Sequence, residues 1–144
     1  LVDTAGVNAK DITFEIVESE ISRDFRRSLE NTSRLRMLGF GLSIDDFGTG
    51  FSSMEQLGIL PFTELKVDRS FVTGICANPQ KQAMVTSTVR MAKDLNLTVV
   101  AEGIETKEEA DFVKTAGCDF GQGYWLSRPI SADVFTDFLI EHNR

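Results

Sequence analysis

Residues 41–53 read Gly-Leu-Ser-Ile-Asp-Asp-Phe-Gly-Thr-Gly-Phe-Ser-Ser and join a short apolar run to two adjacent acids and a glycine-punctuated loop. The run over 41–44 has the length of a buried strand, and Asp45 and Asp46 follow it directly. Two carboxylates at the end of a buried strand are electrostatically unfavourable unless a positive charge lies nearby. This stretch therefore predicts a strand whose carboxyl end opens onto a polar site.

The same arrangement recurs along the chain, where apolar runs of strand length alternate with helical patterns. The expected strands cover residues 12–17, 41–44, 65–67, 98–101 and 119–122. The expected helices cover residues 22–38, 79–95, 107–115 and 132–141. This alternation amounts to about four β/α repeats and predicts an α/β fold with a parallel sheet and helical crossovers.

Each expected strand ends in a side chain that a hydrophobic core would exclude. These residues are Glu15, Asp45 with Asp46, Lys66, Glu102 and Gln122. In a (β/α)₈ barrel the active site draws on the carboxyl ends of several strands, whereas a doubly wound sheet gathers its ligands mainly at one switch point. Five successive polar strand ends therefore favour the barrel.

The length of the chain bounds this interpretation. A full barrel takes about 250 residues, so the 144 residues predict a single unit, 1–144, that forms the C-terminal half of a TIM-like (β/α)₈ barrel. Residues 1–7 read as the tail of a helix already under way. A half barrel exposes two strand edges and an apolar interior, which predicts a homodimer or higher oligomer.

The composition is that of an ordinary globular protein with an acidic surface. Fifteen Lys and Arg against 22 Asp and Glu give a net charge of −7, which excludes a broad basic face for a nucleic acid polymer or an anionic membrane. No apolar run reaches the roughly 20 residues of a membrane span. The spacing of Cys76 and Cys118 fits no zinc site, and both are expected to be buried, reduced thiols. The chain is expected to be cytoplasmic, with any membrane tether in other domains of a parent protein.

The acids at the strand ends are candidate metal ligands. Barrel closure would bring Glu15, Asp45, Asp46 and Glu102 toward one cavity. Oxygen ligands favour Mg²⁺ or Mn²⁺, because the only histidine, His142, lies in the terminal tail. Two cations can clamp the attacking and leaving oxygens of a phosphoryl displacement and activate a bridging water. The alternative is a plain turn in which Asp46 caps a short following helix.

Four further residues each have a functional and a structural interpretation. Lys66 either holds the nucleophilic water and stabilises the transition state, or forms a structural ion pair with one of the acids. Glu18 and Glu105 each lie three residues after an acidic strand end, where they either serve the site or cap a helix N-terminus. Gln122 lies between two glycines that permit close backbone approach, for a ligand contact or for a plain turn.

Five motifs follow one another along the chain. They are Phe14-Glu15-Ile16-Val17-Glu18-Ser19, residues 44–53, Glu64-Leu65-Lys66-Val67-Asp68-Arg69-Ser70-Phe71-Val72, residues 100–106 and residues 117–129. In order and spacing they resemble the C-terminal half of EAL-type cyclic di-GMP phosphodiesterase domains, over nearly the whole chain. The resemblance implies metal-assisted hydrolysis of one phosphodiester bond of cyclic di-GMP to linear pGpG, in bacterial second-messenger signalling.

The resemblance also implies a role for each candidate residue. Two Mg²⁺ or Mn²⁺ ions would be bound by Glu15, Asp45, Asp46 and Glu102. Lys66 would lie beside the attacking water, and Glu102 and Glu105 would be catalytic. Gln122 would contact the dinucleotide, and Glu18 would anchor the loop 46–53. In the family this loop couples metal binding to dimerisation. None of these acids is lost here, which argues against a degenerate relative.

The main departure from the family pattern is an absence. No Glu-Ala-Leu tripeptide occurs in these residues, and the family's Asn ligand and phosphate-binding Arg also belong to earlier strands. Val17 and Phe51 stand where the family usually has Thr and Tyr, which removes no ligand. A parent protein is expected to hydrolyse cyclic di-GMP, whereas this chain alone is not. The alternative is a noncatalytic module that binds cyclic di-GMP or another protein.

Overall fold

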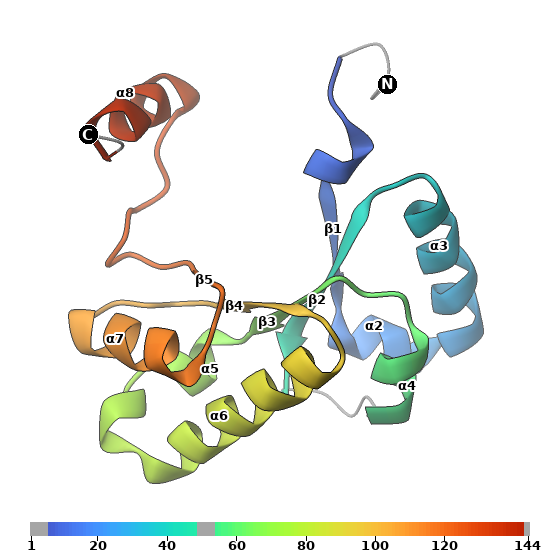
Figure 1. Ribbon diagram of the computed structural model, residues 1–144, viewed down its shortest axis with the longest axis horizontal. Coiled ribbons are helices and arrows are strands. Elements are labelled where there is room, and N and C mark those ends of the chain that lie inside the picture. The colour runs from blue at the N-terminus through green and yellow to red at the C-terminus, as the bar shows by residue number, and fades with distance from the viewer. Residues whose placement is uncertain (1–5, 49–53, 143–144) are drawn as a thin grey trace.

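The structure, a computed structural model, describes residues 6–48 and 54–142. Its centre is a five-stranded parallel sheet in the order β1-β2-β3-β4-β5 (Figure 1). The strands are β1 (Thr13–Val17), β2 (Gly41–Phe47), β3 (Glu64–Val67), β4 (Thr98–Ala101) and β5 (Phe120–Gly121). Because each strand pairs with the next one along the chain, the sheet is wound in one direction, as in a barrel, without the reversal of a doubly wound fold.

At least one helix follows each strand. The helices are α2 (Glu18–Arg23), α3 (Phe25–Met37), α4 (Met54–Ile59), α5 (Arg69–Val72), α6 (Pro79–Asp94), α7 (Lys107–Ala116) and α8 (Ala132–His142), with 3-10 turns η1 (Ala9–Asp11) and η2 (Ile75–Ala77). Figure 1 shows α4 to α7 on one side of the strands and α8 beyond the other side. The expected parallel α/β class is confirmed, and the five strands of the described residues correspond to the five expected ones. No helix in the described ranges is long and apolar enough to cross a bilayer.

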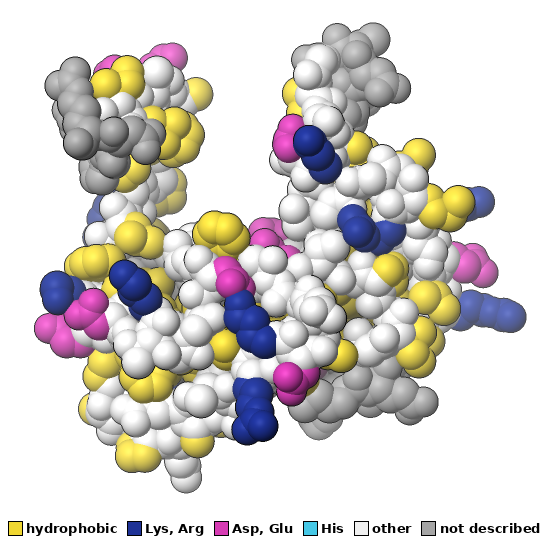
Figure 2. All heavy atoms as spheres, in the orientation of Figure 1, with side chains coloured by type: hydrophobic (Ala, Val, Ile, Leu, Met, Phe, Trp, Pro, Cys, Tyr) yellow, Lys and Arg dark blue, Asp and Glu magenta, His cyan; other side chains and the backbone are white. Residues whose placement is uncertain are grey.

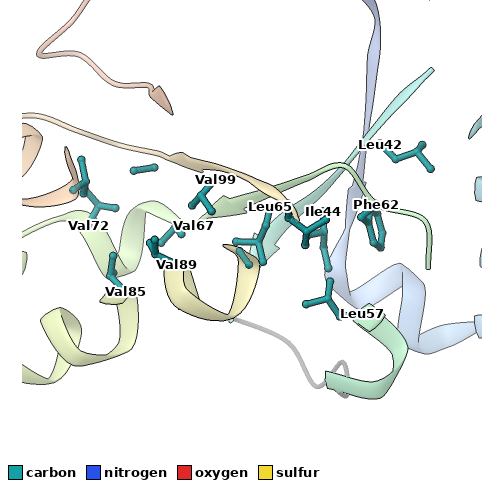
Figure 3. Close-up of a cluster of buried hydrophobic side chains, with 14 of the residues drawn as sticks. Leu42, Ile44, Leu57, Phe62, Leu65, Val67, Val72, Val85, Val89 and Val99 are labelled. Carbon is teal, nitrogen blue, oxygen red and sulfur yellow. The ribbon is translucent and has the colours of Figure 1, made fainter. Parts of the chain in front are cut away.

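The hydrophobic core lies between the sheet and helices α4 and α6. Alternate side chains of a strand point to opposite faces, and Ile44, Leu65 and Val67 are at most 2% exposed on the face that meets the helices. Figure 3 shows Val85 and Val89 of α6 next to Val67. Burying one such side chain contributes roughly 1.5–3 kcal/mol. The intervening positions of β2 and β3 therefore point to the opposite face, which carries the polar residues.

The structure divides the helix that the sequence predicts over 22–38. The backbone leaves the helical region at Asp24 (φ −148°, ψ 81°), and the Asp24 side chain accepts a hydrogen bond from the Arg27 N–H at 3.1 Å. Asp24 thus caps α3 and ends α2, because Asp side chains compete well for the free N–H groups of a helix start. The sequence allows a short helix after Asp46 only as part of a turn, and the structure has α4 there, while the sequence predicts no separate element at α5.

The two cysteines are free thiols, but only one of them is buried to any extent. Cys118 is half-buried, and this burial raises the pKa of its thiol to about 11. Cys76 is exposed, so the expectation that both thiols are buried is wrong for Cys76. It lies in the short turn η2, in which Ile75 is the residue that packs inward.

Candidate metal centre

A local irregularity in β2 allows two adjacent acids to face the same site. β2 pairs with β3 through Ile44 opposite Leu65, and then through Phe47 opposite Val67. β2 therefore has one residue more than β3 in this interval, which is the arrangement of a β-bulge. Asp46 takes a left-handed conformation with φ 56°, which is rare for residues other than glycine and clusters at functional sites. The bulge turns Asp46 back toward Asp45, where a regular strand would point them apart.

Lys66 lies at the centre of the acidic residues. Its Nζ atom is 2.8 Å from Glu15 Oε1, 3.1 Å from Asp45 Oδ1 and 2.7 Å from Glu102 Oε1. These three acids come from β1, β2 and the residue after β4, so the Lys66 ammonium gathers the ends of four neighbouring strands. The Lys66 side chain is only 7% exposed, while Glu15 is 53% exposed at the open side of the cluster.

The cluster has an excess of negative charge. Burial alone would lower the pKa of Lys66, but its close ion pairs with Glu102, Glu15 and Asp45 outweigh burial and raise that pKa well above its ordinary value. Lys66 is therefore a permanent cation that neutralises one of three carboxylates. Asp45 Oδ1 is buried and makes no hydrogen bond of good geometry, although it lies 3.1 Å from Lys66 Nζ. An unsatisfied buried carboxylate oxygen is unfavourable without a further positive partner.

The arrangement fits a divalent cation. One carboxylate oxygen from each of Asp45, Asp46 and Glu102 lies within 4.8 Å of the others. All are hard oxygen donors, which Mg²⁺ and Mn²⁺ prefer. Burial and the neighbouring charges of Asp45 and Asp68 raise the pKa of Asp46. A cation at this point would offset that repulsion and favour the ionised carboxylate.

A pocket of about 510 Å³ adjoins the cluster, and Glu102 belongs to both. Glu105 and Gln122 line it, together with Tyr124 and Arg128, whose guanidinium lies 4.5 Å from the centroid of the Tyr124 ring. Phe135 and Phe138 of α8 also line it. The lining of the pocket therefore combines carboxylates, arginine side chains and aromatic rings.

The glycines around Gln122 serve a close approach between backbone segments. A side chain at position 123 would place its Cβ 2.1 Å from the Ile104 carbonyl oxygen and 2.3 Å from the Ile104 nitrogen. The Gln122 carbonyl accepts the Ile104 N–H at 3.1 Å. The close approach expected here is therefore made to Ile104, and it brings the Gln122 segment alongside the segment that carries Glu102.

Glu18 and Glu105 differ in how they are held. Glu18 is the first residue of α2, and its Oε2 accepts the Gly48 N–H at 2.9 Å. This contact reaches the first part of the loop 46–53, but residues 49–53 lie outside the described residues. Glu105 is exposed and lines the pocket, while its backbone N–H donates to Glu109 Oε2. The helix-capping role considered for Glu105 belongs to Thr106 and Glu109.

The structure adds three residues that sequence reasoning missed. Asp68 caps α5 through the Ser70 N–H and lies near enough to raise the pKa of Asp46. Its signal was the two-residue spacing from Lys66, which places both on one face of a strand. Arg69 lines the pocket beside Glu102 without a distinct sequence signal. Glu109 is signalled by the Thr-x-x-Glu pattern of a capping box.

The fold and the acidic cluster together define a barrel-type α/β protein with a candidate centre for divalent metals. The chain belongs to the EAL domain family, which its sequence matches over residues 1–129. The expected relation to EAL-type cyclic di-GMP phosphodiesterase domains is thereby confirmed.

Three relatives show what this chain is similar to. The cyclic di-GMP phosphodiesterase RocR of Pseudomonas aeruginosa is 39% identical over 127 residues, which cover 88% of this chain and 32% of RocR. The solved PaMucR phosphodiesterase in complex with c-di-GMP superimposes with a TM-score of 0.89 and 37% identity, covering 93% of this chain and 54% of that one. A manganese and cyclic di-GMP complex of Klebsiella pneumoniae BlrP1 has a TM-score of 0.84 and 38% identity, covering 89% and 33%. The chain thus spans only part of each relative.

Proposed function

We propose that this chain supplies the carboxylate-rich side of the active site of a metal-dependent cyclic di-GMP phosphodiesterase, which yields linear pGpG for bacterial second-messenger signalling. One observation carries the proposal: three carboxylates from different strands surround the buried ammonium of Lys66, and Asp45 Oδ1 is still without a hydrogen bond. The choice of cyclic di-GMP as the substrate is supported by the relatives that are named as cyclic di-GMP phosphodiesterases.

Glu15, Asp45, Asp46 and Glu102 would hold two Mg²⁺ or Mn²⁺ ions. When bound, such ions lower the pKa of a coordinated water and neutralise the charge of the phosphodiester. The donor set is compatible with either ion, because all its members are carboxylates. The manganese complex of the related BlrP1 makes Mn²⁺ the practical choice for experiments.

Lys66 acts as a hydrogen-bond donor and a positive charge. Its raised pKa keeps the ammonium protonated at neutral pH, so it is unsuited to accept a proton from water. It would orient Glu15, Asp45 and Glu102 and stabilise the negative charge that develops on the phosphoryl oxygens. Lys66 would lie beside the attacking water, and Glu102, next to Lys66, would accept the proton of that water. One water adds to phosphorus, one P–O bond breaks, and the departing oxygen takes up a proton.

The pocket is assigned to the dinucleotide. Gln122 would offer its amide to the ligand, and Glu105 would support the site from the same wall. Glu18 would anchor the loop 46–53 through Gly48. Arg69 and Arg128 in the lining give an acidic protein local positive charge for an anionic ligand.

The proposal predicts that cyclic di-GMP binds only when metal is present. Residues 1–144 would act as one unit, and turnover would also need the Glu of the Glu-Ala-Leu motif, so these residues alone should bind without hydrolysis. Calorimetric titration of the chain with cyclic di-GMP, with and without Mn²⁺, tests this directly. Metal-independent binding would favour a noncatalytic receptor instead. Absence of binding in both conditions, or turnover at the rate of an intact EAL phosphodiesterase, would contradict the proposal as stated.

We also propose that the chain associates with itself. β1 and β5 are the two edges of the sheet formed by the described residues. Phe14 and Val17 of β1 and Phe120 of β5 are exposed apolar side chains, and Figure 2 shows further apolar side chains on the projecting helix α8. Exposed strand edges with apolar side chains favour pairing with another chain. Light scattering at micromolar concentration should give at least the mass of a dimer, and a clean monomer would refute the proposal.

A further inference from the structure

Glu109 of α7 is a buried carboxylate to which the proposed reaction assigns no role. The residue is 5% exposed. Its Oε1 accepts the Gly74 N–H at 2.8 Å, and its Oε2 accepts the N–H groups of Glu105 at 2.9 Å and Thr106 at 3.2 Å. Burial alone would raise the pKa of Glu109, but these N–H groups outweigh burial and lower it. The side chain is therefore an ionised acceptor of three charge-assisted hydrogen bonds.

Only part of this arrangement is ordinary helix capping. In a capping box the Thr106 hydroxyl accepts a hydrogen bond from the Glu109 N–H, and the Glu109 carboxylate accepts one from the Thr106 N–H. The bonds from Glu105 and Gly74 are additional. Glu105 lies before the helix, and Gly74 lies in the connection between β3 and α6, so Glu109 ties two separate loops to α7.

The segment that Glu109 holds is the one that presents Glu102. The Glu102 N–H still bonds to the Val67 carbonyl, after which Gly103 turns the chain with φ 69°. A side chain at Gly103 would place its Cβ 2.3 Å from Arg69 Cβ, so the turn is tightly packed. After Gly103, the Ile104 N–H donates to the Gln122 carbonyl. The N–H groups of the next two residues donate to Glu109. Losing Glu109 would release one end of a turn that begins at a proposed metal ligand.

We infer that Glu109 is a positioning residue that fixes the turn 102–106, and through it the Glu102 carboxylate, for metal binding. This inference rests on the proposed metal site. Partners that orient metal ligands typically change metal affinity about 10–100-fold when they are replaced. Glu109 acts through the backbone and touches no ligand atom, so the lower end of that range, about tenfold, is expected.

The test compares Glu109→Gln with Asp119→Asn in the 144-residue chain. Asp119 is a matched control because it also accepts a backbone N–H, that of Val99 at 2.7 Å, and pairs with Lys93, yet it contacts β4 near its amino end, whereas Glu102 follows the carboxyl end of β4. Amide hydrogen exchange without metal reports whether the turn is held. Mn²⁺ titration by calorimetry reports the consequence for the site.

Glu109→Gln should speed exchange at the Glu105 and Thr106 amides at least tenfold and weaken Mn²⁺ binding about tenfold. Asp119→Asn should lower the melting temperature but leave both readouts within about twofold. Unchanged exchange in Glu109→Gln would overturn the inference, as would faster exchange with unchanged Mn²⁺ affinity. If the unsubstituted chain binds no Mn²⁺, the proposed metal site itself fails and the positioning role falls with it. That failure is distinct because it is seen before any substitution.

Discussion

Replacing Asp45 by asparagine is expected to weaken Mn²⁺ binding at least hundredfold, since even partners that only orient a ligand are worth about 10–100-fold. The buried Oδ1 of Asp45 has no hydrogen bond of good geometry, and Asp45 is one of the three acids whose carboxylate oxygens lie within 4.8 Å of one another. Asparagine keeps the size of the side chain but removes the charge that a divalent cation requires. Calorimetric titration with Mn²⁺ measures the effect directly.

Thermal unfolding gives an independent measure of the same substitution. At a Mn²⁺ concentration one hundred times its dissociation constant, the unsubstituted chain should gain about 2.7 kcal/mol, or roughly 5–10 °C. A hundredfold weaker site at the same concentration gains only about 0.4 kcal/mol. Without metal, Asp45→Asn should change the melting temperature little, because weaker attraction to Lys66 is offset by weaker repulsion from Asp46 and Glu102.

The control for this prediction is Asp94→Asn, which makes the same chemical change at an exposed position near the end of α6. It should leave the metal-dependent rise in melting temperature intact. If Asp45→Asn keeps that rise as well, Asp45 is not a metal ligand. If both variants lose the metal-dependent rise in melting temperature, the loss is caused by the change in net charge and does not identify Asp45 as a ligand.

The convergence of the polar side chains was predictable because parallel strands end at the same edge of a sheet. Glu15, Asp45, Lys66 and Glu102 each follow or end an apolar run, and the structure brings all four together through Lys66 Nζ. Gln122 arrives beside them in the pocket that Glu102 also lines. The periodicity of the hydrophobic residues and the parallel pairing of the strands predict this convergence without any knowledge of side-chain contacts.

Other features depend on packing that a local pattern does not contain. The bulge at Asp46 arises from the register between β2 and β3. The local sequence does not predict the left-handed conformation of Asp46. One of the hydrogen bonds that Glu109 accepts comes from Gly74, which lies 35 residues away in the chain. The break at Asp24 results from a competition between a helix interior and a helix start, which hydrophobic periodicity alone does not resolve.

The second large effect is expected on stability, when Lys66 is replaced by methionine. The substitution keeps an unbranched side chain but removes the ammonium that lies within 3.1 Å of Glu15, Asp45 and Glu102. Breaking a buried ion pair by removing one partner costs about 3–5 kcal/mol. Glu15 is partly open to solvent, so the lower end, about 3 kcal/mol or roughly 10 °C in melting temperature, is expected.

The control for this substitution is Lys114→Met, at an exposed position in the last turn of α7. It loses the same charge and should cost less than about 1 kcal/mol, the usual worth of a cation at a helix C-terminus. Equal losses in the two variants would show that the ammonium of Lys66 has no special role in the cluster.

The conditions under which Lys66→Met recovers distinguish electrostatics from packing. Without Lys66 the three carboxylates repel one another in the folded state. This repulsion destabilises the fold at neutral pH, and the loss disappears as the pH falls and the acids take up protons. The deficit relative to the unsubstituted chain should therefore shrink between about pH 7 and pH 4, or on adding Mn²⁺. The opposite result is a stability deficit that is the same at both pH values and insensitive to Mn²⁺. Lys66 would then stabilise the protein through the packing of its hydrocarbon stem. The carboxylates would not form the charge cluster on which the proposed metal site depends.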